Sequence, residues 1–155
     1  MTLSINPKDR MGVYKSLDQV PDNLRLKNYN SRYSGRESWE EFLDYYMNRR
    51  SSSESKRRRS ERAWESWCDF TADNNPVLAT PAAVERWTES LIDEYQTSYA
   101  LKGYWAIIER FYTWMMMHVD YPHTYQPFWM AATEYEATKK IWDLKLSRVR
   151  GGKLE

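Results

Sequence analysis

Apolar residues recur at three- and four-residue steps along most of the chain, and short polar breaks separate these stretches. This spacing places apolar side chains on one face of an α-helix, whereas a half-buried strand would need strict alternation. The longest stripe begins near Thr97, and we expect its helix to be the centre of the core. Its apolar members are Leu101, Tyr104, Ile108, Phe111 and Met115. Gly103 within it costs roughly 1 kcal/mol of helix propensity relative to alanine, which predicts a close backbone approach by a neighbouring helix.

Two helices are predicted before this one. Ser38 and Glu41 have the spacing of a capping box, in which the serine accepts from the third amide and the glutamate reaches back. The apolar face of this helix contains Trp39, Phe42, Leu43, Tyr46 and Met47. A second helix is predicted from about Ser55 to Ala72. Its buried side is expected to contain Ala63, Trp64, Trp67, Phe70 and Thr71.

Thr80 and Pro81 predict another helix start, because threonine is a capping residue and proline at the first helical position loses no required N–H. This short helix is expected to end near Asp93, and its inward stripe contains Val84, Trp87 and Leu91. A last helix is predicted from about Phe128 to Leu146. One side of it carries Ala132, Tyr135, Thr138 and Trp142.

These patterns predict one all-α domain, a bundle of about four to five helices over residues 36–147. Residues 1–35 show no sustained period and contain two prolines and two glycines, so we expect an extended N-terminal arm. Residues 148–155 are expected to form a basic linker that contains glycine. The composition agrees, because eight Trp and twelve Tyr against five Gly favour bulky helical packing over a sandwich or barrel.

Several classes of protein are disfavoured by what the sequence lacks. No run approaches the roughly 18 apolar residues of a membrane span, and the N-terminus has no signal-peptide core, so we expect a cytoplasmic protein without a membrane partner. Cys68 stands alone, and His118 and His123 have no zinc-type spacing, so no metal is expected. The common catalytic and nucleotide-binding motifs are absent, which predicts no catalytic residue, no cofactor and no small-molecule substrate.

The net charge of +1 conceals a strong partition along the chain. Residues 49–62 contain seven Lys and Arg against two Glu, a net charge of +5, and residues 139–153 contain six against one Asp, again +5. Between them, residues 63–138 contain eleven acidic and three basic residues, a net charge of −8. Such a protein can present one face to a polyanion and turn the other away. The alternative interpretation is two solvated charge runs without a ligand.

The placement of the first basic cluster favours a phosphate ligand. The cluster occupies the first two turns of the second predicted helix, where cations oppose the helix dipole, so stability alone does not explain it. Its members are Lys56, Arg57, Arg58, Arg59 and Arg62. At the start of the long helix, Thr97, Ser98 and Tyr99 can offer hydroxyls and backbone N–H groups to a phosphate, with Lys102 one turn later. Taken alone, Thr97 and Ser98 are equally well explained as a plain N-cap.

The order and spacing of these features resemble the core-binding domain of tyrosine recombinases, the phage-type integrases. The resemblance covers roughly residues 38–132. The residues that carry it are Trp39-Glu40-Glu41-Phe42-Leu43, the basic helix ending in Trp64, Trp67, Cys68 and Phe70, Thr80-Pro81, Thr97-Ser98, Phe111-Tyr112 with Trp114, and Tyr125-Gln126-Pro127. The arm together with residues 121–127 is most similar to archaeal and archaeal-virus integrases.

This resemblance implies a SAM-like bundle of crossed helical hairpins that forms half of a C-shaped clamp around duplex DNA. The second and the long helix would face the DNA, so the implied contacts are Lys56, Arg57, Arg58, Arg59, Thr97, Ser98 and Lys102. Where the family often has a basic residue just before the Phe-Tyr pair, this chain has Glu109 and then Arg110, which leaves the contact of Arg110 open. Arg148 and Arg150 would begin the basic linker to a catalytic domain and add contacts to DNA.

The 23 residues after Ala132 cannot hold the catalytic half of a recombinase, so we expect this chain to bind and position DNA without cleaving it. The expected partners are double-stranded DNA and other recombinase protomers, in a nucleoid-associated setting. Two alternatives stay open. One is a stand-alone helical DNA-binding regulator, and the other is a helical protein-interaction module that does not bind DNA.

Overall fold

A computed structural model describes residues 14–32, 36–48, 53–72, 75–118, 121 and 123–154. Every regular element in these ranges is a helix, which confirms the prediction of an all-α protein. The main helices are α2 (Arg36–Asn48), α3 (Glu54–Phe70), α4 (Pro81–Glu94), α5 (Thr97–Ala100), the π-helical turn η4 (Leu101–Trp105), α6 (Ala106–Met117), α7 (Pro127–Glu134) and α8 (Glu136–Leu154). Among the described helices, none has the length and apolar character needed to cross a bilayer.

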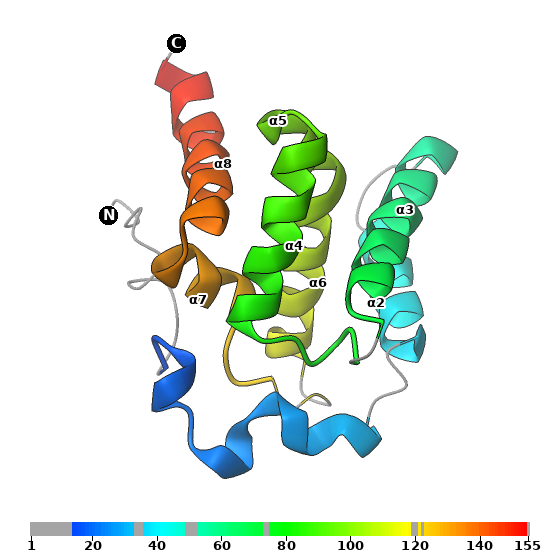
Figure 1. The fold of residues 1–155 in the computed structure, drawn as a ribbon. Coiled ribbons are helices and arrows are strands. Elements are labelled where there is room, and N and C mark those ends of the chain that lie inside the picture. Colours follow the sequence, from blue (N-terminus) through cyan, green and yellow to red (C-terminus); the bar gives the residue numbers. More distant parts are fainter. Residues whose placement is uncertain are drawn as a thin grey trace.

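The helices form three neighbouring groups. Figure 1 shows α2 with α3 on one side, α7 with α8 on the other, and α4 with the long helix α5–η4–α6 between them. We call this continuous segment, Thr97–Met117, the central helix. Both ends of the predicted long helix are close to those observed, because the helix begins at Thr97 and ends three residues before Asp120.

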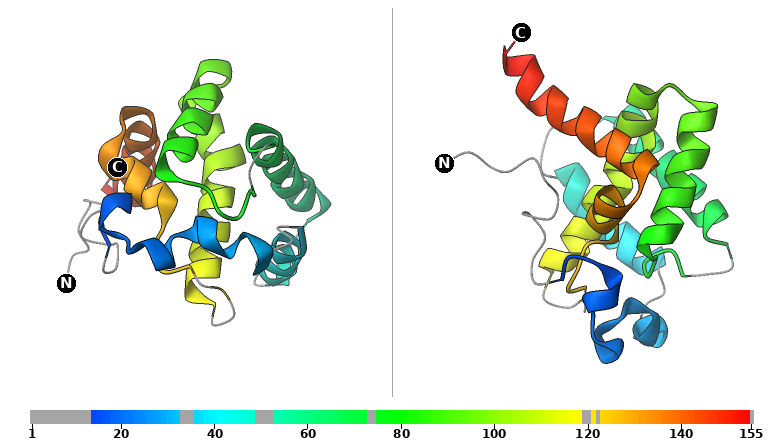
Figure 2. Two further views of the ribbon diagram at one scale, coloured as in Figure 1. Left: turned by 60° about the horizontal axis from the view of Figure 1, so that its bottom comes forward. Right: turned by 60° about the vertical axis from the view of Figure 1, so that its left-hand side comes forward.

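The N-terminal segment differs from the extended arm that the sequence predicts. Its described part, residues 14–32, contains three short 3-10 helices, η1 (Leu17–Gln19), η2 (Asp22–Leu24) and η3 (Leu26–Arg32). The left view of Figure 2 shows this segment running across one end of the helices. Two apolar side chains of this segment, Val20 and Leu26, are buried in a small cluster with Tyr125 and Met130. They do not belong to a regular apolar repeat, so the periodicity of the sequence gives no sign of them. Residues 1–13 lie outside the described part of the chain.

Helices α2 and α3 pack through aromatic side chains. Trp39 of α2 stacks on Trp64 of α3, with ring centroids 4.7 Å apart and planes within 1°. The capping-box prediction for Ser38 is wrong, because α2 begins at Arg36 and Ser38 is buried inside it. Glu41, the other member of that predicted box, instead accepts a hydrogen bond of 2.8 Å from the Tyr121 hydroxyl.

The start of α4 is as predicted. The hydroxyl oxygen of Thr80 accepts from the backbone N–H of Ala83 at 3.2 Å, and Pro81 is the first helical residue. The three inward residues Val84, Trp87 and Leu91 are all buried, which confirms the predicted stripe. The helix ends at Glu94, one residue from the predicted end.

The central helix buries its entire predicted stripe, Leu101, Tyr104, Ile108, Phe111 and Met115. The π-helical turn η4 interrupts it and contains Gly103. Helix α3 packs closely against this turn, but the atoms nearest to Gly103 belong to side chains and not to the backbone. A Cβ atom there would lie 3.8 Å from the Tyr99 ring and 3.9 Å from the Arg62 guanidinium, which are ordinary contacts with side chains.

The last predicted helix, residues 128–146, is two helices. Tyr135 separates α7 from α8 with an extended backbone (φ −129°, ψ 153°), and α8 continues to Leu154 through the segment predicted to be a linker. At the start of α7, the side chain of Gln126 accepts from the backbone N–H of Phe128 at 3.1 Å, and Pro127 is the first helical residue. The direction of α8 is therefore set separately from that of α7.

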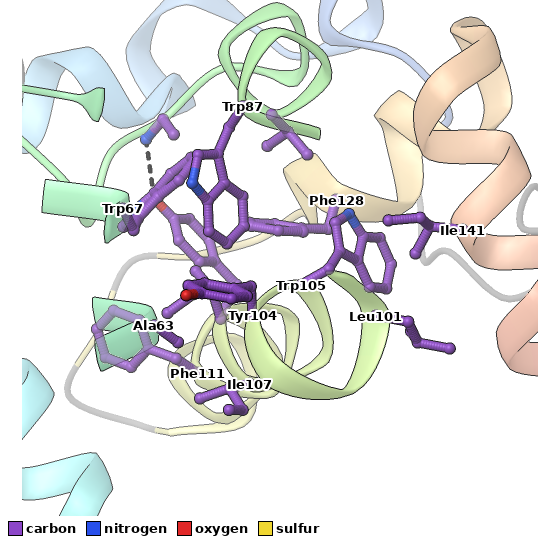
Figure 3. Close-up of a cluster of buried hydrophobic side chains, with 14 of the residues drawn as sticks. Ala63, Trp67, Trp87, Leu101, Tyr104, Trp105, Ile107, Phe111, Phe128 and Ile141 are labelled. Carbon is purple, nitrogen blue, oxygen red and sulfur yellow. Dashed lines mark hydrogen bonds between the residues drawn. The ribbon is translucent and has the colours of Figure 1, made fainter. Parts of the chain in front are cut away.

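The core is rich in aromatic side chains, several of which Figure 3 shows. Trp67 of α3 packs edge-on against Trp87 of α4 at a centroid distance of 4.9 Å, and both are almost fully buried. Phe128 of α7 contacts both rings. Replacing such a tryptophan with alanine costs about 3–5 kcal/mol. Phe70, predicted to be buried at the end of α3, is 38% exposed, so that part of the prediction is wrong.

Candidate nucleic-acid interface

One groove of the protein is lined mainly by basic side chains. Its volume is about 370 Å³, and α2, α3, the central helix and α8 all contribute to it. The lining residues are Tyr46, Lys56, Arg59, Ser60, Leu101, Lys102, Ala106, Ile107, Arg110, Lys145 and Arg148. We call this site the basic groove. Six of its lining residues are Lys or Arg, and none of the described residues that line it is acidic.

The first turns of α3 supply Lys56 and Arg59. The hydroxyl oxygen of Ser53 caps this helix by accepting from the backbone N–H of Lys56 at 3.2 Å. One turn later, the buried hydroxyl of Ser60 donates to the carbonyl oxygen of Lys56 at 3.0 Å. The cap and this bond fix the backbone that carries both cations at the positive end of the helix dipole, where an anionic ligand is favoured.

Tyr46 of α2 links two of the cations. The Lys56 ammonium lies 4.1 Å from the centre of its ring, and the Arg110 guanidinium donates to its hydroxyl oxygen at 2.8 Å. Phe42 stacks on the same ring at 5.4 Å and keeps it in place. Cation–π contacts of this kind contribute roughly 0.5–1 kcal/mol at exposed sites. Tyr46 therefore holds cations from α3 and α6 side by side at one edge of the groove.

On the opposite side, a buried carboxylate orients Lys145 of α8. Glu109 of α6 is 3% exposed, and its Oε1 atom lies 2.7 Å from the Lys145 ammonium. Its other oxygen accepts from the indole N–H of Trp129 at 2.9 Å. Both oxygens thus have donors, as a buried charge requires. The pair leaves the remaining ammonium hydrogens of Lys145 for the groove that this residue lines.

A second carboxylate anchors the beginning of α8. Glu85 of α4 accepts from the backbone N–H of Ala137 and of Thr138, at 2.9 Å each, and from the Thr138 hydroxyl at 2.7 Å. It acts as an N-cap supplied by another helix. Together with the Glu109–Lys145 pair, it fixes α8 at two places, so that Arg148 also reaches the groove.

The structure brings together four of the residues that the sequence singled out for DNA: Lys56, Arg59, Lys102 and Arg148. These four come from three separate segments of the chain. Contact with DNA stays a prediction for each of them.

The other candidate residues do not line the groove. Arg57 forms an ion pair of 3.8 Å with Glu61, and Arg62 lies over the rings of Tyr99 and Tyr104. Arg58 is exposed, and Thr97 and Ser98 are partly buried at the start of the central helix. The side chain of Arg150 is outside the described part of the chain.

Sequence reasoning missed three members of the groove that carry or hold its positive charge. It left the contact of Arg110 open, placed Tyr46 only on the apolar face of a helix, and did not single out Lys145. A signal for Lys145 was present, because it is three residues before Arg148 and such residues are neighbours on a helix surface. Because the sequence predicts that the last helix ends at Leu146, Arg148 was not expected to lie on the same helix as Lys145. No local signal identifies Tyr46 as a cation-binding ring.

Two other side chains that carry reactive groups are held in neutral forms. Burial, with a smaller contribution from Asp69, raises the pKa of the Cys68 thiol to about 11, so the reactive thiolate is scarce at neutral pH. Burial lowers the pKa of His123 to about 4.

Comparisons with known proteins do not identify a family, since no family model matches the chain and neither a curated protein nor a solved structure is significantly similar to it. The functional argument therefore depends on the groove itself. Its charge and its assembly from separate helices are the properties that a function must explain.

Proposed function

We propose that the basic groove binds the phosphate backbone of double-stranded DNA. The observation that carries this proposal is the convergence of six Lys and Arg side chains, from α3, the central helix and α8, on one groove with no acidic residue among the described residues that line it. Like charges repel, so such a cluster is costly in the free protein and gains value when an anion binds. Each phosphate that a cation neutralises also releases condensed counterions, which favours binding at low salt.

We further propose that the chain is the core-binding domain of a tyrosine recombinase of the archaeal or archaeal-virus integrase type. Support for this class comes from the order of sequence features between Ser38 and Ala132, together with the all-α architecture. In this role the chain grips and positions duplex DNA, and it contributes no catalytic residue. Its partners would be DNA and other recombinase protomers, at the nucleoid.

A salt titration tests DNA binding directly. We would measure the affinity for a fluorescently labelled random duplex by anisotropy at salt concentrations between about 50 and 200 mM, where a protein that neutralises several phosphates loses orders of magnitude in affinity. The double change of Lys102 and Arg110 to alanine should weaken binding. It should also reduce the slope of log affinity against log salt by about 0.9 for each phosphate that the variant no longer neutralises.

The matched control is Arg86→Ala, since Arg86 is exposed on α4 and does not line the groove. It should leave the slope unchanged. An equal effect of the control and the double variant would show that the groove is the wrong surface. A parent protein indifferent to DNA at low salt would favour the helical protein-interaction module instead.

A further inference from the structure

The basic groove has an interior that duplex binding does not use. Between its cations the floor of the groove is formed by Leu101, Ala106 and Ile107 of the central helix, of which Ala106 is partly exposed and the other two present only a small part of their side chains. Phosphates need no apolar surface, and a duplex is far too wide to enter a cavity of about 370 Å³. That volume falls in the range of small-ligand sites, roughly 300–1,000 Å³. Only a small unit of a nucleic-acid strand fits inside.

The small side chain of Ala106 keeps this interior open. Lys102, Ala106 and Arg110 follow one another at four-residue steps, and all three line the groove. The alanine therefore lies between two cations along the helix, where a longer side chain would fill the space. An apolar floor with cations on both sides matches the chemistry of one nucleotide, whose base is flat and weakly polar and whose flanking phosphates are anionic.

Arginine side chains around the floor add to this match. Arg59 approaches from α3 and Arg148 from α8, on either side of the central helix. Guanidinium groups stack on unpaired bases as well as pairing with phosphates. The ring of Tyr46 is not available for stacking, because Phe42 and Lys56 already pack against it. The base would thus lie against aliphatic side chains and guanidinium planes.

We propose that the basic groove takes up a single unpaired nucleotide of a DNA strand, with its base against Leu101, Ala106 and Ile107 and its phosphates against the surrounding cations. This inference rests on the proposed function, because it specifies which form of DNA the same site prefers. A duplex that contains one unpaired nucleotide then binds more tightly than a fully paired one. The difference depends little on salt, because it comes from base burial and not from charge.

The test compares three labelled duplexes of equal length by anisotropy at one salt concentration. One is fully paired, one carries a single unpaired thymidine, and one carries an abasic residue at the same place. Base stacking on protein side chains gives the expected size, so the thymidine duplex should bind roughly fivefold to a hundredfold more tightly than the other two. Replacing the thymidine with 2-aminopurine gives a direct readout, since its fluorescence changes when the base leaves water.

Ala106→Leu fills the floor and should abolish this preference while paired duplex still binds. Ala72→Leu is the matched control, because Ala72 is exposed beyond the end of α3. Far-ultraviolet circular dichroism checks that both variants fold. The comparison of the three duplexes uses the unchanged protein, so it tests the proposal even if a variant does not fold.

The outcomes separate the two proposals. Equal affinity for the thymidine and abasic duplexes, or for all three, would overturn the nucleotide site and leave duplex binding intact. Failure to bind any of the three would overturn the proposed function and this inference with it. Binding of an oligoglutamate peptide in that case would assign the groove to an acidic protein segment.

Discussion

Acidification is expected to destabilise this fold through His123. The side chain is 3% exposed, and its Nε2–H group donates to the carbonyl oxygen of Val77 at 2.8 Å. Burial lowers its pKa from 6.5 to about 4, because the imidazolium form would lose its hydration, and the hydrogen bond to Val77 opposes this shift only in part. The folded protein therefore keeps the imidazole neutral at pH values where the unfolded chain is already protonated.

The sign and size of the effect follow from this difference. Above pH 6.5 the side chain is neutral in both states, and the full free energy of unfolding is present. Between pH 6.5 and about 4 only the unfolded state gains the proton, so the free energy of unfolding falls by about 1.4 kcal/mol per pH unit. The total loss is about 3 kcal/mol, a large part of the roughly 5–15 kcal/mol that holds a typical domain together.

Urea denaturation near pH 7 and again near pH 4.5 measures this loss. His123→Gln keeps a donor for Val77 but does not titrate, so its loss on acidification should be smaller than that of the parent by most of the roughly 3 kcal/mol calculated above. Carboxylates also titrate in this window, so the difference between the two proteins is the quantity to compare. Thr124→Ala, a change at the exposed neighbour, is the control. Parallel pH profiles for parent and His123→Gln would refute the reasoning.

Three further substitutions test contacts that place the helices. Glu85→Ala removes the acceptor at the start of α8 and should lower the free energy of unfolding by about 1–3 kcal/mol, measured by urea denaturation. The same change at exposed Glu89 of α4 should lower it by less than about 0.5 kcal/mol, and equal losses would contradict the capping role. Tyr112→Phe leaves the buried N–H of Ala79 without its acceptor, whereas the carbonyl oxygen of Pro76 still accepts from the Trp67 indole. Thermal unfolding should therefore show a loss of about 1–3 kcal/mol, and an unchanged melting temperature would argue against the bond to Ala79. Glu109→Ala leaves the Trp129 indole N–H without its acceptor and leaves Lys145, which is 29% exposed, to the water of the groove, so it should cost about 1–3 kcal/mol. A neutral result would show that water replaces the carboxylate.

The parts of the fold that the sequence predicts correctly are those set by local chemistry. The stripe from Leu101 to Met115 is buried as expected, because a regular apolar spacing leaves only one face of a helix to turn inward. The Thr80–Pro81 start is also as predicted, since the cap and its amide lie within three residues of each other. Such features need no information about the rest of the chain.

The errors occur where residues far apart in the sequence determine the local structure. The break at Tyr135 is reinforced by Glu85 of α4, which is about 50 residues away in sequence and caps the helix that follows. Ser38 has capping-box spacing, but it lies inside α2 and is buried, so tertiary burial overrides that local signal.

The candidate site shows the same division. The basic start of α3 is visible in the sequence, and Lys56 and Arg59 do line the groove. The role of Lys145 is not visible, because Glu109 on another helix fixes its position. Arg110 likewise becomes part of the site only through its bond to Tyr46 of α2. Runs of charged residues in the sequence therefore identify only part of a site that four helices assemble.

The π-helical turn η4 accommodates one more residue than an α-helical turn would, because its backbone hydrogen bonds span five residues instead of four. Each residue of an α-helix turns the chain by about 100°, so the same residues in a regular α-helix would rotate the turn that carries Lys102 by roughly that angle relative to α6. Lys102 would then leave its position in line with Arg110, although every charged residue would still be present. Natural relatives that keep the same ligand should therefore either retain the π-helical turn or lack one residue there.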